Sequence, residues 1–531
     1  MVSIAMIGAG TCPVSAATVY VDQASPNPEP PYSTPATAAH GIQDAVDVTT
    51  NGDTVVVEPG TYNLTNQITV TNGILLESSG GAGQTILSAQ TNFSGPTNVW
   101  CLWVSNSDAV VDGFTIQCPS GSEVAAATFV ADGTVQNCDF TNYTIYTFGS
   151  EIVMGGGVLS NSTVCYLGGP SGNGSAIYCY NGSLVTDCRI LNSGKLPETK
   201  GIYLEGSTVT NSLICGSHYV APGGGGPALY AISSSIIHCT ITNSWSQGPG
   251  PGGGAFLDSS FMDRCTIIGN RLYGVGPGYT GGGAGGGGVF ETNSIIRDSL
   301  IVSNIAQTLP DTGVGAGGGV SMQGGMLINC TVSGNSAYGG TNPAEGSGVY
   351  VESGGITNSV IYFNYNNFPP AEGEWFNVGS GVFDHCCTTP DPGGIGNITQ
   401  DPRFVDATNG DFHLAPDSPC IGAGIVQPWM TGAEDLDGYP RTVPGAVDMG
   451  AYEHQAPDPP LVVILNPRWA DNVFSFNFPT QTNHTYAVQW TYSMAPVSWQ
   501  VLTNFAGDGA TMAVTNVDAV APARFYRVVV Q

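Results

Sequence analysis

The sequence predicts an all-β fold built from short strands that stack as the coils of a solenoid. Between Val135 and Asn364 one pattern returns nine times, each time around a marker residue that is followed by Cys or Ser. The position two residues before each marker is apolar, and so is the position three residues after it. A fixed register separated by stretches of unequal length is typical of a solenoid whose insertions lie in loops. The markers are Asn137, Asn161, Asp187, Asn211, His238, Arg264, Asp298, Asn329 and Asn358.

Composition agrees with this interpretation. The chain has 531 residues, of which 75 are Gly, and only 10% of its residues are charged, against a usual share of about a quarter. Gly permits tight corners and close stacking of the backbone. A solenoid also uses its length along one axis, so a long chain need not divide into several globular domains.

Each predicted coil consists of strands that bend at the marker. Apolar residues alternate there with Thr or polar residues, as a half-buried strand requires. Asn and Asp suit the bend because they tolerate the left-handed backbone conformation and bond locally to the backbone. With this recurring turn and these inward stacks, the chain resembles right-handed parallel β-helix proteins of the broad pectate-lyase-like group. The resemblance implies a right-handed parallel β-helix over residues 18–455, with repeat coils over about 61–366.

The N-terminal stretch has two expected parts. Residues 1–17 resemble a secretory signal segment that ends in small residues. Residues 18–60 are expected to form a cap containing an amphipathic helix, which covers the open strand edges of the first coil. The apolar face of this helix would be Ala38, Ile42, Ala45 and Val46. No other apolar run is long enough to cross a membrane, so we predict no membrane span.

The C-terminal part has three expected pieces. Residues 367–455 contain the stretches DPRFVD, GDFHL, DSPCIGAG and VDMGAYE, and this series resembles the closing segment of "choice-of-anchor" secreted β-helix proteins, whose anchors vary. That resemblance implies a secreted or cell-surface location. Residues 456–460 (APDPP) predict a semi-rigid linker. Alternating strand candidates in residues 461–531 predict a small β-sandwich that would serve anchoring, sorting or glycan contact.

The charge of the chain restricts its partners. Eleven Lys and Arg residues against 40 Asp and Glu residues give a formal net charge of −29. We expect no nucleic-acid binding, because contact with phosphates needs a basic face. A bare polyuronate is disfavoured by like charge unless a cation bridges it. Glycans, divalent cations or other copies of the chain are therefore the expected partners.

Five cysteines share the position after a marker, which points them inward as a partial ladder. We interpret them as buried thiols that pack as small hydrophobic residues. Only Cys239 and Cys265 occupy adjacent coils of this ladder, so only they are close enough to bridge, with strain. The five are Cys138, Cys188, Cys239, Cys265 and Cys330.

Three successive markers carry the catalytic candidates. His238, Arg264 and Asp298 should stack along one turn, within about 5 Å of one another from coil to coil. Such a group would bind an anionic sugar or share proton transfer. The alternative is a turn ladder in which three solvated side chains compensate one another's charge. Asp258 and Asp263, taken with Asp298, form a second possible carboxylate set.

The closing segment contains the metal candidates. Asp435, Asp437 and Asp448 would bind Ca²⁺, a hard cation that prefers carboxylate oxygens. The alternative is a charged cap in which Arg441 pairs with these carboxylates. No other cofactor is expected.

Two classes of function follow from the sequence. The first is a non-catalytic extracellular or cell-surface protein that acts as a rigid structural, adhesive or self-assembling scaffold and binds glycans. The second is a polysaccharide lyase or glycoside hydrolase, an activity that the pectate-lyase-like resemblance implies. No catalytic motif of that group matches this chain residue by residue, which favours the scaffold.

Overall fold

The computed structural model describes most of the chain. The first 15 residues, which hold most of the expected signal segment, and the expected linker lie outside the described residues. The described residues are 16–90, 100–118, 126–141, 150–166, 175–192, 200–220, 226–247, 252–273, 286–307, 316–339, 345–366, 373–442, 445–455, 462–471, 473–482, 484–493, 498–516 and 524–530.

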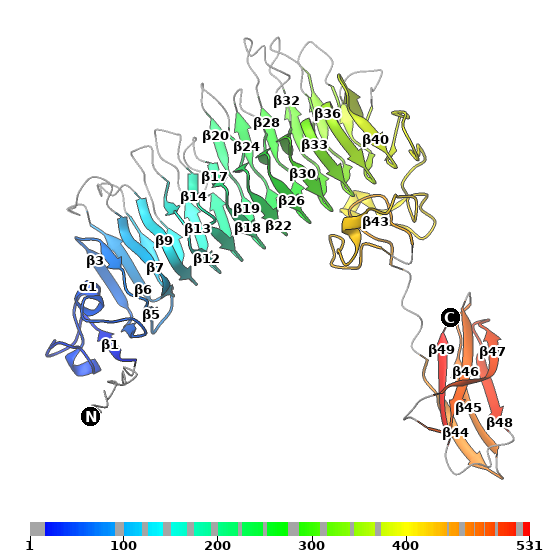
Figure 1. Ribbon diagram of the computed structural model, residues 1–531, viewed down its shortest axis with the longest axis horizontal. Coiled ribbons are helices and arrows are strands. Elements are labelled where there is room, and N and C mark those ends of the chain that lie inside the picture. Colours follow the sequence, from blue (N-terminus) through cyan, green and yellow to red (C-terminus); the bar gives the residue numbers. More distant parts are fainter. Residues whose placement is uncertain are drawn as a thin grey trace, which may run out of the picture. The chain divides into compact units, whose positions relative to one another are not determined.

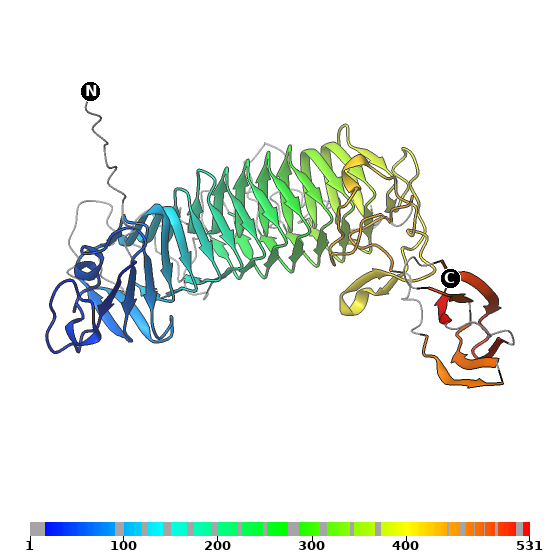
Figure 2. The same cartoon turned by 60° about the horizontal axis from the view of Figure 1, so that its bottom comes forward.

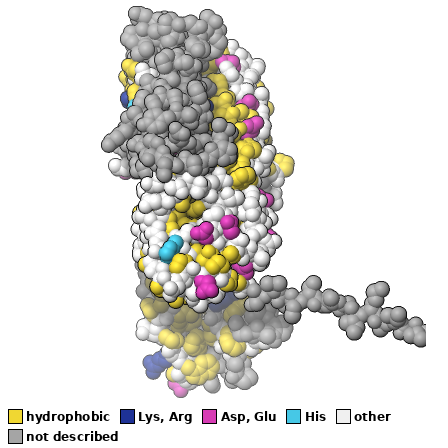
Figure 3. All heavy atoms as spheres, turned by 90° about the vertical axis from the view of Figure 1, so that its left-hand side faces the viewer, with side chains coloured by type: hydrophobic (Ala, Val, Ile, Leu, Met, Phe, Trp, Pro, Cys, Tyr) yellow, Lys and Arg dark blue, Asp and Glu magenta, His cyan; other side chains and the backbone are white. Residues whose placement is uncertain are grey.

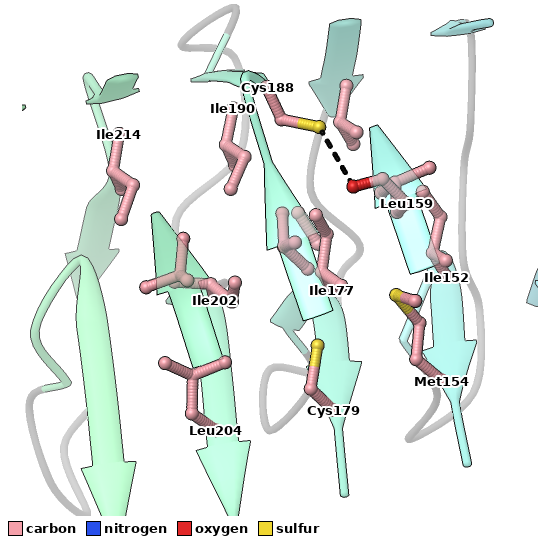
Figure 4. Close-up of a cluster of buried hydrophobic side chains, with 14 of the residues drawn as sticks. Ile152, Met154, Leu159, Ile177, Cys179, Cys188, Ile190, Ile202, Leu204 and Ile214 are labelled. Atoms are coloured by element: carbon pink, nitrogen blue, oxygen red, sulfur yellow. Dashed lines mark hydrogen bonds between the residues drawn. The ribbon is translucent and has the colours of Figure 1, made fainter. Parts of the chain in front are cut away.

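The chain folds as stacked coils in which three parallel sheets run along one axis (Figure 1). Figure 2 shows the coils following one another in chain order, from the blue N-terminal cap to the yellow end. The largest sheet has 22 strands, the second has 13 and the third has 6. Apolar side chains from all coils point inward and form one continuous core, part of which is drawn in Figure 4. The predicted all-β solenoid is therefore confirmed.

The largest sheet contributes up to two strands to each coil. Its strands are β1 (Thr18–Val21), β2 (Thr54–Val57), β4 (Ile68–Val70), β5 (Leu75–Ser78), β7 (Trp100–Asp112), β9 (Ala126–Gln136), β11 (Ile152–Met154), β12 (Val158–Ser160), β14 (Ser175–Cys179), β15 (Leu184–Thr186), β17 (Lys200–Glu205), β18 (Thr208–Thr210), β21 (Leu229–Ile232), β22 (Ser235–Ile237), β25 (Ala255–Asp258), β26 (Phe261–Asp263), β29 (Val289–Thr292), β30 (Ile295–Arg297), β33 (Val320–Ile328), β36 (Val349–Thr357), β39 (Trp375–Asn377) and β40 (Val382–Asp384).

The two smaller sheets complete the coils. The 13-stranded sheet contains β3 (Gly60–Leu64), β6 (Thr85–Ala89), β8 (Thr115–Gln117), β10 (Asp139–Thr141), β13 (Thr163–Tyr166), β16 (Arg189–Asn192), β19 (Leu213–Cys215), β23 (Thr240–Thr242), β27 (Thr266–Ile268), β31 (Leu300–Val302), β34 (Thr331–Ser333), β37 (Val360–Tyr362) and β41 (Cys387–Thr388). The six-stranded sheet contains β20 (His218–Val220), β24 (Trp245–Gln247), β28 (Arg271–Tyr273), β32 (Ile305–Gln307), β35 (Ser336–Tyr338) and β38 (Tyr365–Asn366).

Both ends of the coil stack differ in detail from the expectation. The N-terminal helix α1 (Ile42–Val46) is present and buries Ile42, Ala45 and Val46, but Ala38 precedes it and follows the short 3₁₀ helix η1 (Pro35–Thr37). At the other end, the coils continue beyond residue 366, because β39, β40 and β41 add strands in register with the preceding coil. In this last coil His385 takes the marker position with φ 53°, but the position three residues after it is Thr388 and not an apolar residue.

The marker residues form the bend that was expected of them. All nine have a positive φ, between 43° and 54°, which is the left-handed conformation that Asn and Asp tolerate best. His238 and Arg264 adopt it as well, because inward packing on both sides fixes the path of the turn. The residue after the marker then points into the core, where a Cys or Ser donates a hydrogen bond to the carbonyl two residues before it.

A ladder of asparagines runs through the core beside the third sheet. Asn304 accepts hydrogen bonds from the backbone N–H and the side-chain amide of Asn270, at 2.9 and 3.0 Å. Its own amide donates to the Ile267 carbonyl and to Asn335. Asn335 repeats the pattern onto Asn364. The carboxylate of Glu374 ends the ladder by accepting from Asn364 and from the Phe363 backbone.

We expect Asn304→Ala to destabilise the coil stack strongly. The substitution leaves buried donors and acceptors on Asn270, Ile267 and Asn335 without their partner, and each unpaired buried group costs about 1–3 kcal/mol. Urea unfolding of the full-length protein measures this loss. Asn63→Ala, an exposed position on β3, is the control. A loss no larger than that of the control would contradict a stabilising role for the ladder.

One acidic side chain lies inside the core. Glu291 on β29 is 0% exposed and aligns with inward Leu257 and Met322. Its Oε2 accepts from the Ser294 N–H at 2.9 Å, and its Oε1 has no partner among the described residues. Burial raises the pKa of the Glu291 carboxyl to about 8, well above its ordinary value, against the opposing effect of the Ser294 hydrogen bond.

This buried carboxyl predicts a specific pH dependence. The folded state keeps a proton on Glu291 that the unfolded state releases above a pH of about 4.5, so the free energy of unfolding falls as pH rises through the window up to about 8. We expect Glu291→Gln to remove this part of the fall, on the order of a few kcal/mol at most. Thermal unfolding at several pH values checks it, with Glu77→Gln on the outer face as the control. Parallel pH profiles of wild type and Glu291→Gln would refute it.

Residues beyond the last coil fold back onto the side of the stack as the closing segment, residues 401–454. It contains the antiparallel pair β42 (Phe404–Asp406) and β43 (Asp411–Leu414) and the short 3₁₀ helices η2 (Ala407–Asn409) and η3 (Pro428–Met430). Phe412 packs on Leu300 and Val302, which lie on the outer side of β31 and are buried by this contact. A second contact joins Cys420 and Met449 to Val360 and Cys387.

Residues 455–531 form a separate compact unit. One antiparallel sheet contains β44 (Leu465–Ala470), β45 (Val473–Pro479) and β48 (Thr511–Asn516); the other contains β46 (Thr485–Thr491), β47 (Gln500–Ala506) and β49 (Phe525–Val530). Side chains of both sheets meet in one core around Phe476, Phe478 and Tyr486. The predicted small β-sandwich is therefore confirmed. Among the described residues, no helix is long and apolar enough to span a membrane.

Candidate functional site

Aromatic side chains occupy one register position along the outer face of the largest sheet. The strand pairings align this position from coil to coil over most of the stack. Two coils lack a ring there, at Val153 and at Ser321. We call these rings the aromatic column: Phe129, Tyr178, Tyr203, Tyr230, Phe256, Phe290, Tyr350 and Phe376.

In the middle of the column the rings stack on one another. Tyr203 and Tyr230 are 4.8 Å apart between ring centroids and 11° from parallel, and Tyr230 and Phe256 are 4.4 Å apart. Phe290 continues the stack at 5.8 Å from Phe256. A ring stacked on both sides offers only its edge to solvent. These central rings therefore stabilise the coil stack, each pair by about 0.5–1.5 kcal/mol.

The column is interrupted near its N-terminal end, between β9 and β14 (Figure 1). Val153 lies in register between Phe129 and Tyr178 and carries no ring. Two coil spacings, roughly 9–10 Å, thus separate the rings on either side. The result is a groove of about 780 Å³, which we call the aromatic slot. It is lined by Trp100, Phe129, Val153, Tyr178, Tyr180, Asn181, Glu205, Gly206, Ile232 and Ser233.

Aromatic pairs form both walls of the slot. Trp100 stacks on Phe129 at 4.8 Å on one side, and Tyr178 lies 5.5 Å from Tyr180 on the other. Gly155 is the next outward position after Val153, and a Cβ there would lie 2.8 Å from the Tyr180 hydroxyl. The absence of side-chain bulk at residues 153 and 155 therefore keeps the slot open.

Polar groups line the rim of the slot. The Tyr178 hydroxyl donates to Glu205 at 3.0 Å. Burial, followed by this hydrogen bond, raises the pKa of Tyr178 to about 12, so the hydroxyl stays protonated at neutral pH. Asn181, Glu205 and Ser233 are exposed. The slot thus combines flat apolar walls with donors and acceptors at its edge, an arrangement that suits a flat ligand rich in hydroxyl groups.

Lys200 is the basic side chain that lies over the rings in the middle of the aromatic column. Its ammonium lies over the rings of Tyr203 and Tyr230, 5.3 and 4.8 Å from their centroids. Burial lowers the pKa of Lys200 below its ordinary value. The Lys200 ammonium therefore stacks on aromatic rings next to the slot. Acidic side chains are prominent on the end of the molecule that Figure 3 shows.

The catalytic candidates His238, Arg264 and Asp298 do follow one another along the marker turn, but they face different surroundings. His238 is exposed, and partial burial together with nearby Arg264 lowers its pKa. Arg264 pairs with Asp263 at 3.0 Å and with Glu434 of the closing segment at 2.7 Å. Asp298 is 1% exposed, so a substrate cannot reach it while the closing segment is in place.

Asp298 instead belongs to a buried ion-pair network. Arg441 of the closing segment contacts Asp298 at 2.7 Å and Glu453 at 3.1 Å, and its guanidinium also donates to two backbone carbonyls. Burial raises the pKa of Asp298 to about 6, while attraction to Arg441 opposes the rise. Arg297 bridges Asp298 to Asp263. The geometry makes this network a docking contact for the closing segment. Asp258 lies on the outer face of β25 and makes no contact with the network among the described side chains.

The Ca²⁺ candidates Asp435, Asp437 and Asp448 are each engaged in the closing segment. Asp435 is 0% exposed and accepts from the backbone of Asp437, Tyr439 and Glu453. Asp448 accepts from the backbone of Gly422 and His454. Asp437 accepts from His413 at 2.6 Å. Within the described residues, no three His, Cys, Asp or Glu side chains are grouped closely enough to hold a metal ion.

Sequence reasoning does not identify the aromatic column, although the signal is present. Each ring precedes the marker of its coil by a near-constant interval, as Tyr203 precedes Asn211 and Tyr230 precedes His238. An outward residue in a strand alternates with inward ones, so this interval places the rings on the outer face. The slot itself depends on one missing ring, and only the alignment of neighbouring coils reveals that.

One family model matches part of the coils. The model of the right-handed beta helix region matches residues 175–365, and the predicted right-handed parallel β-helix is thereby confirmed. No curated protein sequence matches the chain.

Solved structures with a similar course include polysaccharide lyases. Pectate lyase Pel9A is 14% identical with a TM-score of 0.35, and the match covers 83% of this chain and 98% of that chain. The alginate lyase from Paenibacillus sp. str. FPU-7 is 14% identical with a TM-score of 0.30, over 58% of this chain and 95% of that chain. A rhamnogalacturonan lyase is 13% identical with a TM-score of 0.30, over 76% and 97%.

Proposed function

We propose that the protein is a non-catalytic scaffold, secreted or held at the cell surface, that binds neutral glycans in the aromatic slot. The observation that carries this proposal is the interruption of the aromatic column at Val153, which leaves the walls around Phe129 and Tyr178 two coils apart. A pyranose ring is flat and apolar on its faces and polar at its rim. It would lie between the aromatic walls and exchange hydrogen bonds with Glu205 and Asn181 at the edge.

The charge of the protein favours a neutral ligand. With a net charge of −29, the chain repels a polyuronate, and the exposed carboxylate in the slot, that of Glu205, would lie against the ligand. A sugar hydroxyl can donate to that carboxylate, whereas a uronate would place a second negative charge beside it. A polyuronate would therefore need a bridging cation such as Ca²⁺.

A scaffold role is supported by how the coils are stabilised. Stacked rings outside and the asparagine ladder inside repeat the same contact in successive coils, which favours a stiff rod. The C-terminal unit, with its two antiparallel sheets, would supply attachment to a surface or to another copy of the chain. The alternative function is a polysaccharide lyase or glycoside hydrolase. It is favoured by Lys200, a potential base whose pKa is lowered by burial beside the slot.

A binding and turnover panel tests the proposal. The full-length protein is titrated by calorimetry with neutral β- and α-linked oligosaccharides and with oligogalacturonate, each with and without Ca²⁺, and the products are analysed by chromatography. We expect saturable binding of a neutral oligosaccharide, no binding of oligogalacturonate without Ca²⁺, and no change in chain length. Cleavage of any substrate would establish the enzyme alternative. Failure to bind every neutral glycan would overturn the proposal.

A further inference from the structure

Cysteines of the inward ladder have different surroundings from two pairs of cysteines outside it. Those of the inward ladder each donate to the carbonyl two residues earlier, as Cys188 does to Thr186 and Cys330 to Ile328. Ser162 and Ser212 make the same bond at the same position of other coils. A ladder cysteine is thus interchangeable with serine, and its role is that of a hydrogen-bond donor.

Two cysteines outside the ladder face each other. Cys101 lies at the start of β7 and Cys118 directly follows β8, and both are buried in the core of one coil. Their sulfur atoms are 2.8 Å apart. That separation is shorter than the contact distance of two independent thiols, although it is longer than the 2.03–2.05 Å of a disulfide bond. The two sulfur atoms therefore face each other across the coil, and bond formation requires them to approach by roughly 0.8 Å.

A second pair joins the closing segment to the last coil. Cys387 on β41 and Cys420 of the closing segment are both buried in the cluster that contains Val360 and Met449. The Cys387 thiol donates to the Gln400 carbonyl at 3.2 Å, and interaction with the Cys420 thiol, followed by burial, raises the pKa of Cys387. Neither residue occupies the ladder position after a marker.

We propose that Cys101–Cys118 and Cys387–Cys420 are disulfide bonds in the mature protein. The first closes one early coil across its interior, and the second fastens the closing segment to the last coil. We expect the ladder cysteines, including Cys239 and Cys265 in adjacent coils, to stay reduced, because each donates to a carbonyl of its own turn, whereas Cys387 donates to Gln400 in the segment that follows its strand. This assignment does not depend on whether the slot binds a glycan.

The chemistry is ordinary thiol–disulfide exchange. A thiolate of one cysteine attacks a low-molecular-weight disulfide such as oxidised glutathione and releases one molecule of its thiol. The second cysteine then attacks the mixed disulfide and releases the other. For each protein bond, the two cysteines lose two electrons and two protons in total, and one small disulfide is reduced to two thiols. Because the sites are buried, oxidation would precede completion of folding.

Peptide mapping tests the proposal. The full-length protein is secreted into an oxidising compartment and denatured without reductant in the presence of iodoacetamide, which alkylates free thiols. It is then digested with pepsin and analysed by mass spectrometry. We expect one linked pair of peptides containing Cys101 and Cys118, another containing Cys387 and Cys420, and alkylation of every ladder cysteine. Reduction of the protein before alkylation should make four further cysteines available to iodoacetamide. Each pair is decided by its own linked peptide.

Variants separate these bonds from accidental oxidation. Without reductant, Cys101→Ser/Cys118→Ser should melt below wild type, and dithiothreitol should lower its melting temperature by less, because only the Cys387–Cys420 bond is left to reduce. Cys138→Ser should keep the wild-type response. Alkylation of Cys101, Cys118, Cys387 and Cys420 without reduction would overturn the proposal even if the double variant failed to fold. A Cys239–Cys265 linkage in their place would overturn it as well.

Discussion

Val153→Phe is expected to abolish glycan binding by completing the aromatic column. The new ring would lie one coil spacing, about 4.8 Å, from Phe129 and from Tyr178, which is the spacing of the stacked rings elsewhere in the column. It would occupy the place of the sugar while adding stacking contacts, so the fold should be as stable as wild type or more stable. The ligand would lose an aromatic contact of about 0.5–1.5 kcal/mol on each of two walls, or about 1–3 kcal/mol in total. We therefore expect Kd to rise by at least roughly 5- to 150-fold.

A matched substitution distinguishes the slot from the rest of the column. Phe256→Leu removes a ring that is stacked on both sides, so it should lower the melting temperature without changing the Kd. Tyr178→Ala should weaken binding, because it removes a wall and the hydroxyl that Glu205 accepts from. Calorimetry and thermal unfolding of the three variants give both quantities. Unchanged binding by Val153→Phe would show that the slot is not the site.

Arg441→Met is expected to release the closing segment from the side of the coils. Arg441 is 0% exposed, and its removal takes away the positive charge that Asp298 and Glu453 share and leaves Asp298 with Arg297. Breaking a buried pair by removing one partner costs about 3–5 kcal/mol, which is a large share of the stability of a segment of this size. Hydrogen exchange of residues 435–453 in the presence of reductant measures the release. The reductant is needed because the proposed Cys387–Cys420 bond would hold the segment in place.

Two control variants sharpen this experiment. Arg403→Met removes an exposed pair with Asp417, which should cost less than 1 kcal/mol. Asp298→Leu combined with Arg441→Met removes both charges and should recover part of the lost protection. If exchange of residues 435–453 in Arg441→Met matched that of Arg403→Met, the network would not hold the closing segment. Exposure of Asp298 in the Arg441→Met variant would also show whether the candidate trio gains any activity once uncovered.

The sequence predicts the coils because their information is local and repeated. Each strand, bend and inward ladder position is decided by a few adjacent residues, and the next coil repeats them in the same register. The pattern from Asn137 to Asn358 therefore carries the architecture, including the left-handed bend that His238 and Arg264 adopt against their usual preference. His385 repeats the marker of the last coil, with φ 53° and Cys386 directly after it. That coil escapes prediction because Thr388 stands where the pattern expects an apolar residue.

The candidate sites are predicted less completely, because they depend on contacts that are neither local in the sequence nor repeated. The expected stacking of His238, Arg264 and Asp298 follows from register alone, but register does not reveal that the closing segment covers Asp298. The sequence offered Asp435, Asp437 and Asp448 as the partners of Arg441. In the structure its carboxylate partners are Glu453 and Asp298, and Asp298 is 143 residues away in the chain. The aromatic slot likewise requires the alignment of three coils around Val153.

The sequence by itself determined the solenoid, its inward ladders, the cap at its start and the sandwich at its end. These features depend on periodicity within short segments, where the side chain's place on a strand follows from its position alone. Only the tertiary structure decided which charges are buried, which rings stand apart and which thiols meet. Those outcomes depend on contacts between segments that are far apart in the chain. Such a contact lowers the free energy of the folded state only after the coils have brought the two segments together.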